Sequence, residues 1–174
     1  MNMKKPIVIA ISALLLGLCV WAVISLRSNI PETPELAIKA FYEREVAEDQ
    51  IMDPLILAGP AIIPLLERDL ANPQMQNKRY AIGALGNLHS EAALPILKTL
   101  AGAKSEVDYI RCDALTAIAM IDRQEGRRVA SQLAKDEPKC FGEIVDGLNR
   151  DYDSWLESYA PRRTYLQALL GRHN

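Results

Sequence analysis

The sequence predicts an all-α fold, in which a short α-solenoid of antiparallel helix pairs follows a single N-terminal transmembrane helix. Three observations lead to this prediction. The chain opens with a long uncharged apolar segment, two later segments share a helical apolar pattern at a constant offset, and aromatic residues make up only 6% of the composition. With 174 residues, of which 49% are apolar, the chain is long enough for one domain with a buried core.

The predicted membrane anchor is the run 6–26, which contains 21 residues and lies uncharged between Lys5 and Arg27. A helix of this length spans about 30 Å, which is the thickness of the hydrocarbon core of a bilayer. Lys4, Lys5 and the α-amino group precede the run, so the positive-inside rule predicts a cytoplasmic tail, residues 1–5, and an external domain. We therefore expect a single-pass protein of the cytoplasmic membrane, with its repeat domain in the periplasm if the cell is Gram-negative.

Two other interpretations of this N-terminal segment stay open. Val23 and Ser25 form a weak small-x-small site, which a cleaved secretory signal would need. A lipoprotein signal would use Cys19 as the modified residue, but Leu18 precedes it and further apolar residues follow. A retained anchor explains the length of the run and the charges that flank it better than either alternative.

Two helix pairs repeat with an offset of 33 residues. The segment that begins at Lys78 matches the segment that begins at Arg111, and the match continues into the helices that follow. Small and large apolar residues recur at matched positions: Ala81 and Ala114, Ala84 and Ala117, Leu85 and Ile118, Leu88 and Ile121, Ile96 and Val129, and Leu100 and Leu133. A single helix pair cannot bury its apolar stripe, so neighbouring pairs are expected to stack and to share a core.

These residues resemble the HEAT repeat family, in particular its short bacterial HEAT-like form. That form has a basic residue, then A-x-x-A-L-G-x-L, a turn, and a second helix that begins with Ala-Leu-Pro. The segment "RYAIGALGNLHSEAALPILKTL" carries nearly all of this motif, whereas in the next copy Ala119 replaces the glycine and Arg127 and Arg128 replace Leu-Pro. The resemblance covers about residues 55 to 135 and implies a fold, not an activity. An ordinary helical bundle with two similar hairpins is the alternative.

The ends of such an array must be capped. We expect a linker over 27–34, repeats over 35–135 and a C-terminal helical cap over 136–174. Thr33 is the predicted N-cap of a front helix, with Pro34 at its first position. The residues expected on the inner side of this front helix are Leu36, Ala37, Ala40, Phe41 and Val46.

Two short helices are predicted in the C-terminal cap. Ser154 and Glu157 fit a capping box at the start of the first helix, and Trp155 and Tyr159 are expected to plug the open end of the array. The second helix is expected to open at Pro161, to turn an apolar side toward the core and to end at Gly171. That apolar side consists of Leu166, Leu169 and Leu170.

No motif of a known catalytic or metal site is present. The chain has two histidines, and His89 falls at a predicted turn between paired helices, where a structural role is expected. The three cysteines form no CxxC. Stacking would bring Cys112 and Cys140 alongside each other, so a disulfide and a pair of buried thiols both stay open. We predict no enzymatic activity, no metal and no cofactor.

The remaining candidate is a binding surface. Beyond residue 30 the chain carries 17 basic and 22 acidic residues, which argues against a nucleic-acid partner. In solenoids of this type the second helices line one face, and the later ones are basic here. The candidate residues for binding a protein partner are Lys98, Arg123, Arg127, Arg128 and Lys135. The alternative is that these charges only keep an exposed helix soluble.

The predicted function is therefore that of a membrane-anchored interaction or scaffolding module whose protein partner is unknown, with the lipid bilayer contacted through residues 6–26. Two other functions stay open. Some proteins with similar repeats are lyases that attach bilin chromophores to phycobiliproteins, which would make the chain an enzyme. The chain would instead be a structural subunit of an envelope complex if Ser12, Ala13 and Gly17 form a helix-packing strip within the bilayer.

Overall fold

The computed structural model describes residues 4–133, 139–159 and 162–171, with side chains from residue 11 onward. All regular elements in these residues are helical, which confirms the predicted all-α class. The α-helices are α1 (Lys4–Arg27), α2 (Pro34–Glu43), α3 (Asp53–Ala58), α4 (Ile63–Leu70), α5 (Lys78–Asn87), α6 (Leu94–Gly102), α7 (Asp108–Ile121), α8 (Arg123–Leu133), α9 (Lys139–Asn149), α10 (Tyr152–Tyr159) and α11 (Tyr165–Leu170). Three short 3₁₀ turns are η1 (Glu48–Gln50), η2 (Gly59–Ile62) and η3 (Glu91–Ala93).

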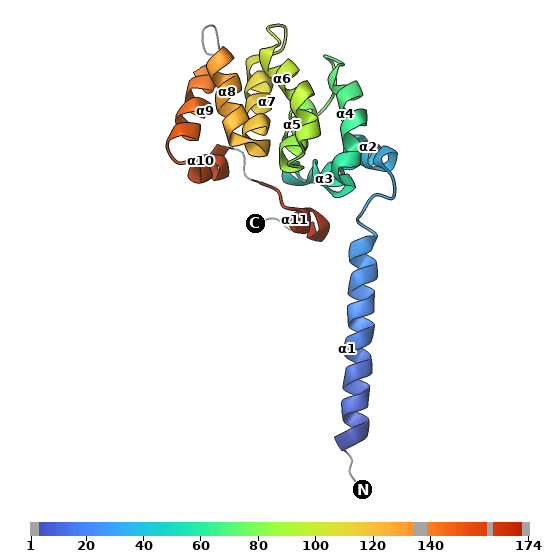
Figure 1. Cartoon of the computed structure of the whole chain (residues 1–174). Helices are drawn as coiled ribbons and strands as arrows, with labels where there is room; N and C mark the ends of the chain where they lie inside the picture. Colours follow the sequence, from blue (N-terminus) through green and yellow to red (C-terminus); the bar gives the residue numbers. More distant parts are fainter. Residues whose placement is uncertain (1–3, 134–138, 160–161, 172–174) are drawn as a thin grey trace.

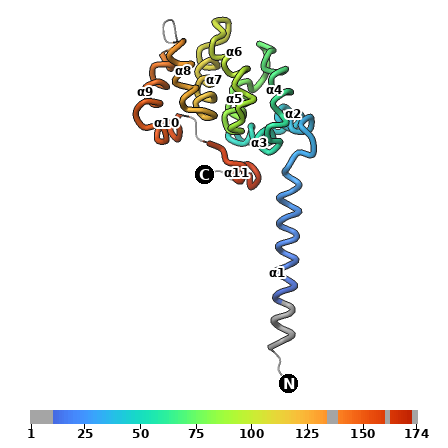
Figure 2. Tube along the Cα trace, in the orientation of Figure 1, coloured from blue at the N-terminus to red at the C-terminus, as the bar shows by residue number. Residues whose placement is uncertain are grey.

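The helices after α1 form one packed domain. Figure 1 shows α4 to α9 side by side in chain order along an arc, and α1 extending away from it. Helix α7 lies at the centre, where it packs against α5, α6, α8 and α9. Helix α3 contacts α2, α5 and α11, so the last helix returns to the start of the domain. The Cα trace in Figure 2 follows the same course.

The core is built from the residues that recur between the two matched segments. Ala81 and Ala84 on α5 and Ala114 and Ala117 on α7 are buried, as the offset of 33 residues predicts. Large apolar residues at neighbouring positions of both helices fill the space around these alanines. The small side chains let the two helix backbones approach closely, and the large ones remove apolar area from water.

Two glycines lie where the backbone of one helix comes close to the backbone of another. A Cβ on Gly126 of α8 would stand 2.8 Å from both the Cα and the Cβ of Ala119 on α7. A Cβ on Gly86 of α5 would stand 3.1 Å from the Cα of Ala117. Since backbone atoms are the obstacles, a side chain could be accommodated only by moving one helix away from the other.

Gly126→Ala is expected to destabilise the domain, whereas Gly142→Ala is expected to stabilise it. Both glycines lie inside helices, so alanine improves the helix propensity of both by about 1 kcal/mol. Overpacking against Ala119 opposes this gain at Gly126 by about 1–3 kcal/mol, and a Cβ on Gly142 meets nothing within 4 Å. Urea denaturation followed by circular dichroism checks the difference. Equal stabilisation of the two variants would contradict the close helix contact.

A disulfide joins α7 to α9. It links Cys112 to Cys140, whose Cα atoms are 6.2 Å apart, and so decides between the two alternatives that the sequence left open. Cys19 on α1 is a free, exposed thiol. The bond ties the central helix to the C-terminal part of the domain.

His89 has the structural role that its place in the sequence predicts. It adopts a left-handed backbone conformation with φ of 49°, between α5 and η3. Its Nδ1 lies 2.9 Å from the carbonyl oxygen of Met120. Burial and the nearby Arg162 lower the pKa of the imidazole, so the neutral ring is favoured at this turn.

In the described residues, one stretch is long and apolar enough to be a candidate for a membrane span. The stretch Glu48–Leu70 is long enough, but it is divided into η1, α3, η2 and α4 and 44% of its apolar window is buried in the domain. The stretch Ile11–Arg27 of α1 is shorter, and its large apolar side chains from Ile11 to Ile24 are more than half exposed. The first stretch therefore serves as core, and the second is exposed from residue 11 to residue 24.

The front cap is confirmed in part. The hydroxyl of Thr33 accepts a hydrogen bond of 3.3 Å from the amide of Leu36, and Ala37 and Phe41 are buried. The side chain of Leu36, predicted to face inward, is 47% exposed, and Val46 lies beyond the end of the helix. Helix α2 ends at Glu43, so the predicted amphipathic pattern was extended too far.

The predicted start of α10 was wrong, because Asp151 and not Ser154 caps it. The carboxylate of Asp151 accepts a hydrogen bond of 3.2 Å from the amide of Ser154, and the helix begins at Tyr152. The rings of Trp155 and Tyr159 stack, with centroids 5.7 Å apart. Trp155 packs against the core cluster, in agreement with the predicted aromatic plug, while Tyr159 is more exposed.

The last helix differs most from its prediction. The capping box of α11 is formed by Thr164 and Gln167, and Pro161 lies outside the described residues. Ala168 is buried and Leu169 packs against the core as predicted, whereas Leu166 and Leu170 are 61% and 36% exposed. The physical reason is that α11 packs on α3 and not on α10, so a different side of it faces the core. Gly171 ends the helix with φ of 58°, as predicted.

Candidate functional site

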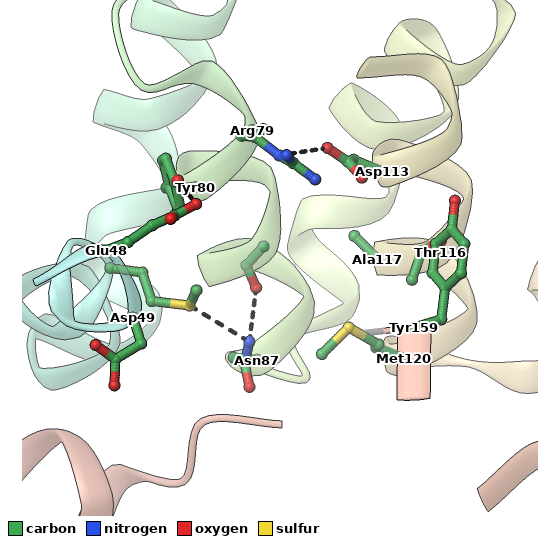
Figure 3. A pocket seen from close by; sticks show the side chains of 12 residues that line it. Glu48, Asp49, Arg79, Tyr80, Asn87, Asp113, Thr116, Ala117, Met120 and Tyr159 are labelled. Atoms are coloured by element: carbon green, nitrogen blue, oxygen red, sulfur yellow. Dashed lines mark hydrogen bonds and ion pairs between the residues drawn. The ribbon is translucent and has the colours of Figure 1, made fainter. Parts of the chain in front are cut away.

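A cavity of about 400 Å³ opens between α5 and α7, with η1 and α10 at its edges (Figure 3). Positions that match between the two similar sequence segments line it. The pairs are Tyr80 and Asp113, Gly83 and Thr116, and Asn87 and Met120. Within each helix these positions are three, then four residues apart, so they form one stripe along the helix. The first helices of the pairs therefore line the cavity, whereas the sequence analysis expected a surface on the second helices.

The hydroxyl of Thr116, at the wall of the cavity, is buried without a hydrogen-bond partner. The residue is 2% exposed, and its Oγ1 has no hydrogen-bond partner. Burying an unpaired hydroxyl costs about 1–3 kcal/mol, and folded proteins keep few such groups. Figure 3 shows Thr116 on the α7 side, across the cavity from Tyr80 and Glu48. Since water does not reach this oxygen either, a ligand atom would pair with it and remove the penalty only after a side chain of the cavity wall moves aside.

An ion pair closes one end of the cavity. The Nε of Arg79 on α5 donates to Oδ2 of Asp113 on α7 over 3.2 Å. Burial raises the pKa of the Asp113 carboxyl, and the neighbouring guanidinium opposes this effect. Since the Arg79 side chain is largely exposed, it can swing outward and leave the carboxylate to a ligand without breaking helix packing.

A tyrosine and a glutamate form the side of the cavity near η1. The hydroxyl of Tyr80 donates a hydrogen bond to a carboxylate oxygen of Glu48. Desolvation raises the pKa of the Tyr80 phenol, and the Glu48 carboxylate adds to the effect. The phenol therefore stays protonated and acts as a donor.

Two methionines supply apolar walls. Met52 and Met120 both line the cavity. The amide nitrogen of Asn87 donates to the Gly83 carbonyl over 2.9 Å and contacts the Met52 sulfur at 3.7 Å. Because methionine has three rotatable bonds and a polarisable sulfur, such walls adapt to ligands of irregular shape. The cavity thus offers an adaptable apolar slot beside an unpaired hydroxyl and several carboxylates.

The C-terminal segment is attached to a residue that lines this cavity. The side-chain oxygen of Asn87 accepts a hydrogen bond of 2.7 Å from the backbone amide of Arg163. The guanidinium of Arg163 holds the carboxylate of Asp53, with Nε–Oδ1 and Nη2–Oδ2 distances of 2.7 and 2.8 Å. Both side chains of this ion pair are more than nine-tenths buried. The segment from Arg163 to α11 therefore connects α3 with the lower end of α5.

The polar contacts of the cavity suit binding. Its hydroxyl, carboxylate, amide and guanidinium groups are hydrogen-bond donors and acceptors around an apolar slot. In the described part of the chain, no group of three or more His, Cys, Asp or Glu residues is placed to hold a metal ion.

Two of the predicted partner-binding residues make internal contacts. Arg123 donates to the carbonyl oxygen of Leu148 through Nη2 at 2.7 Å and Nε at 3.2 Å, and Arg127 donates to the same oxygen. The Arg123 guanidinium also lies over the ring of Tyr152, 4.7 Å from its centroid. Both arginines therefore satisfy a carbonyl in the last turn of α9, where positive charge is favourable.

The other three residues predicted to bind a partner are Lys98, Arg128 and Lys135. Lys98 on α6 and Arg128 on α8 both pair with Glu125, which Arg128 holds through two hydrogen bonds of 2.6 Å. The bonds from Arg128, and then that from Lys98, lower the pKa of Glu125 to about 2. Lys135 lies outside the described residues. The structure thus places Lys98 and Arg128 together on one carboxylate, away from the cavity, and binding of a partner at these residues stays a prediction.

Thr116→Val is expected to raise the free energy of unfolding by about 1 kcal/mol, because valine has nearly the same shape and removes the unpaired hydroxyl. Thr99→Val is the matched control. Thr99 is exposed on α6 and its hydroxyl donates to the Pro95 carbonyl over 3.0 Å, so its replacement is expected to leave stability unchanged or slightly lowered. Urea denaturation checks both. A clear loss of stability in Thr116→Val would mean that the hydroxyl is paired in the unliganded protein.

Sequence reasoning missed the cavity, although the repeat alignment contains a signal for it. Tyr80 and Asp113 occupy matched positions, as do Gly83 and Thr116, and at both positions the apolar pattern of the helices is interrupted. Polar residues that recur on one stripe of a stacked helix are good candidates for a shared surface.

Comparison of the chain with protein-family models, with curated proteins and with solved structures finds no match in any of the three.

Proposed function

We propose that the protein is a membrane-anchored α-solenoid of HEAT-like repeats whose cavity between α5 and α7 binds a segment of a partner protein without catalysis. The observation that carries this proposal is the buried, unpaired hydroxyl of Thr116 within a cavity lined by matched repeat positions. Packing of α7 against α5, α6, α8 and α9, and the buried alanines at the matched positions, support the solenoid.

The anchor is supported by the exposure of α1. Its large apolar side chains from Ile11 to Ile24 are all more than half exposed, and Trp21 is 68% exposed. Each large apolar side chain left in water forgoes about 1.5–3 kcal/mol, so a lipid environment is the natural solvent for this helix. Lys4 and Lys5 favour a cytoplasmic N-terminus, and the disulfide between Cys112 and Cys140 fits a domain on the oxidising side of the membrane.

The chemistry of the cavity favours a particular kind of partner segment. Met52 and Met120 form apolar walls that would accept an apolar side chain. Glu48, Asp49 and Asp113 line the cavity, and Arg79 is the basic residue among those that line it. We therefore expect a segment that inserts an apolar side chain beside Thr116 and carries a basic residue next to it. Tethering both molecules to one membrane raises their effective concentration, so weak contacts suffice.

Photo-crosslinking in intact cells tests the location of the site. A photoreactive phenylalanine analogue replaces Tyr159, which borders the cavity, or Tyr42 on α2, which does not line it. Tyr42 is the matched control for Tyr159, since each of the two residues is 37% exposed. A covalent adduct of defined mass is expected from position 159 and not from position 42. Equal adducts at both positions, or none at position 159, would contradict a partner site in this cavity.

A further inference from the structure

We infer that α11 lies on the membrane surface and is a second contact with lipid, beside the end of the transmembrane helix. This inference rests on the proposed anchoring through α1. It assigns a role to the C-terminal helix, whose exposed apolar side is unexplained by the packing of the domain.

The exposed side of α11 is unusually apolar. Tyr165, Leu166 and Leu170 are exposed, whereas Ala168 is buried against the domain. In the described residues beyond α1, the exposed leucines are Leu36, Leu166 and Leu170, so a helix of six residues holds two of the three. Isolated exposed leucines need no explanation, but a cluster on one short helix marks a surface that is covered in the working protein.

Helix α11 is fixed next to the point where the chain leaves α1. The side-chain amide of Asn29 donates to the carbonyl oxygen of Leu169 over 3.2 Å, and Asn29 follows the last residue of α1 by two positions. Gln50 donates to the carbonyl oxygen of Gly171 over 2.7 Å. Figures 1 and 2 show α11 at the end of the domain from which α1 extends. If α1 crosses the bilayer, its end at Arg27 marks the membrane surface, and α11 is held at that level.

The attachment of α11 to the domain is firm, so its exposed side is not the result of a frayed end. The buried ion pair between Arg163 and Asp53 holds the chain just before the helix. Thr164 and Gln167 form a complete capping box. The helix therefore presents Leu166 and Leu170 in one orientation, with little further loss of conformational entropy on binding.

The residues around this patch are those of a membrane–water interface. Tyrosine rings are favoured at the level of the headgroups, where their apolar body and polar hydroxyl are both satisfied, and Tyr165 is part of the exposed side. Arg27 at the end of α1 and the exposed Arg162 can pair with lipid phosphates. A bilayer is favoured over a protein as the covering surface, because the spanning helix already places the patch beside lipid.

Depth measurement in reconstituted vesicles tests the inference. The full chain is labelled with a fluorophore on single cysteines in detergent, without reductant, and reconstituted in vesicles of phosphatidylethanolamine and phosphatidylglycerol. The native Cys19, whose two fellow cysteines are joined in a disulfide, reports on α1. Leu166→Cys in a Cys19→Ser background reports on α11. Val107→Cys in the same background is the control, since this exposed residue precedes α7 at the opposite end of the domain (Figure 1).

Quenching by lipids with a nitroxide at a shallow or deep position, and by aqueous iodide, reads out depth. We expect the label at Cys19 to respond to the deep quencher, the label at Leu166→Cys to the shallow one, and the label at Val107→Cys to iodide alone. Iodide quenching at Leu166→Cys as strong as at Val107→Cys, with Cys19 still in the bilayer, would overturn the role of α11 alone. A label at Leu166→Cys that is shielded from all three quenchers would mean that a protein covers α11, and would also overturn it. Quenching of Cys19 by iodide would overturn the anchor, and with it this inference.

Discussion

Arg163→Ala is expected to lower the free energy of unfolding by about 3–5 kcal/mol, because it leaves the buried carboxylate of Asp53 without a counter-charge. The guanidinium forms two hydrogen bonds of 2.7 and 2.8 Å with that carboxylate, and its Nη1 also lies 3.7 Å from a carboxylate oxygen of the exposed Asp49. The same change releases the segment before α11 from α3, so the C-terminal helix is expected to become accessible to protease. Urea denaturation and limited proteolysis of the detergent-solubilised chain measure the two effects.

The neighbouring Arg162 is the matched control for this change. Arg162 is exposed, and Arg162→Ala is expected to alter stability by no more than about 0.5 kcal/mol. Adding Asp53→Asn to Arg163→Ala removes the unpaired charge and is expected to restore part of the loss. A loss below about 1 kcal/mol in Arg163→Ala would contradict the structural role given to this ion pair.

Removal of the disulfide is expected to have an effect of similar size. Cys112 and Cys140 are 28 positions apart, and closing a loop of this length lowers the entropy of the unfolded chain by an amount worth about 3–4 kcal/mol at 25 °C. Cys112→Ala together with Cys140→Ala should lower the urea midpoint accordingly. Dithiothreitol should shift the midpoint of the wild-type chain and leave that of the double variant unchanged.

The free thiol supplies the control for the disulfide. Cys19 lies on α1 and forms no bond, so Cys19→Ser is expected to leave the unfolding midpoint and its response to dithiothreitol unchanged. Mass spectrometry after alkylation without reduction should find one modified cysteine. Three modified cysteines would show that Cys112 and Cys140 are not joined.

The core around α5 and α7 was predictable because helical periodicity alone determines which residues face inward. Ala84 and Ala117 are buried, as their matched positions require, and Gly126 lies where the backbone of α8 comes close to that of α7. Local chemistry was equally informative at Thr33 and Gly171, since an N-cap hydroxyl and a left-handed C-cap depend on only a few neighbouring residues.

The C-terminal cap was less predictable because it depends on contacts between residues far apart in the chain. Arg163 and Asp53 are separated by 110 positions, and their ion pair turns α11 onto α3. The apolar residues of α11 were therefore assigned to the core from periodicity, although Leu166 and Leu170 are exposed. Periodicity identifies an apolar side of a helix but does not tell whether protein or another medium covers it.

Only part of the candidate site could be predicted from the sequence. The basic residues of α8 formed the most conspicuous charge pattern, but Arg123 and Arg127 bind the carbonyl of Leu148, 25 and 21 residues away. Nothing local reveals such a contact, because the orphan carbonyl belongs to another helix. The alignment of the two segments contains the polar positions that line the cavity. It does not predict that α5 and α7 both face this cavity, because that depends on how the two helices pack.

The most direct test of a binding cavity between stacked repeats is the yield of the photo-crosslinked adduct from position 159 in intact cells, measured with and without Thr116→Val. If the Thr116 hydroxyl pairs with the partner, its loss should lower the yield about fivefold, the factor that corresponds to a hydrogen bond of about 1 kcal/mol. The same substitution is expected to leave the unliganded protein more stable, so a fall in yield would not be due to unfolding. An unchanged yield would contradict the assignment of the partner site to this cavity.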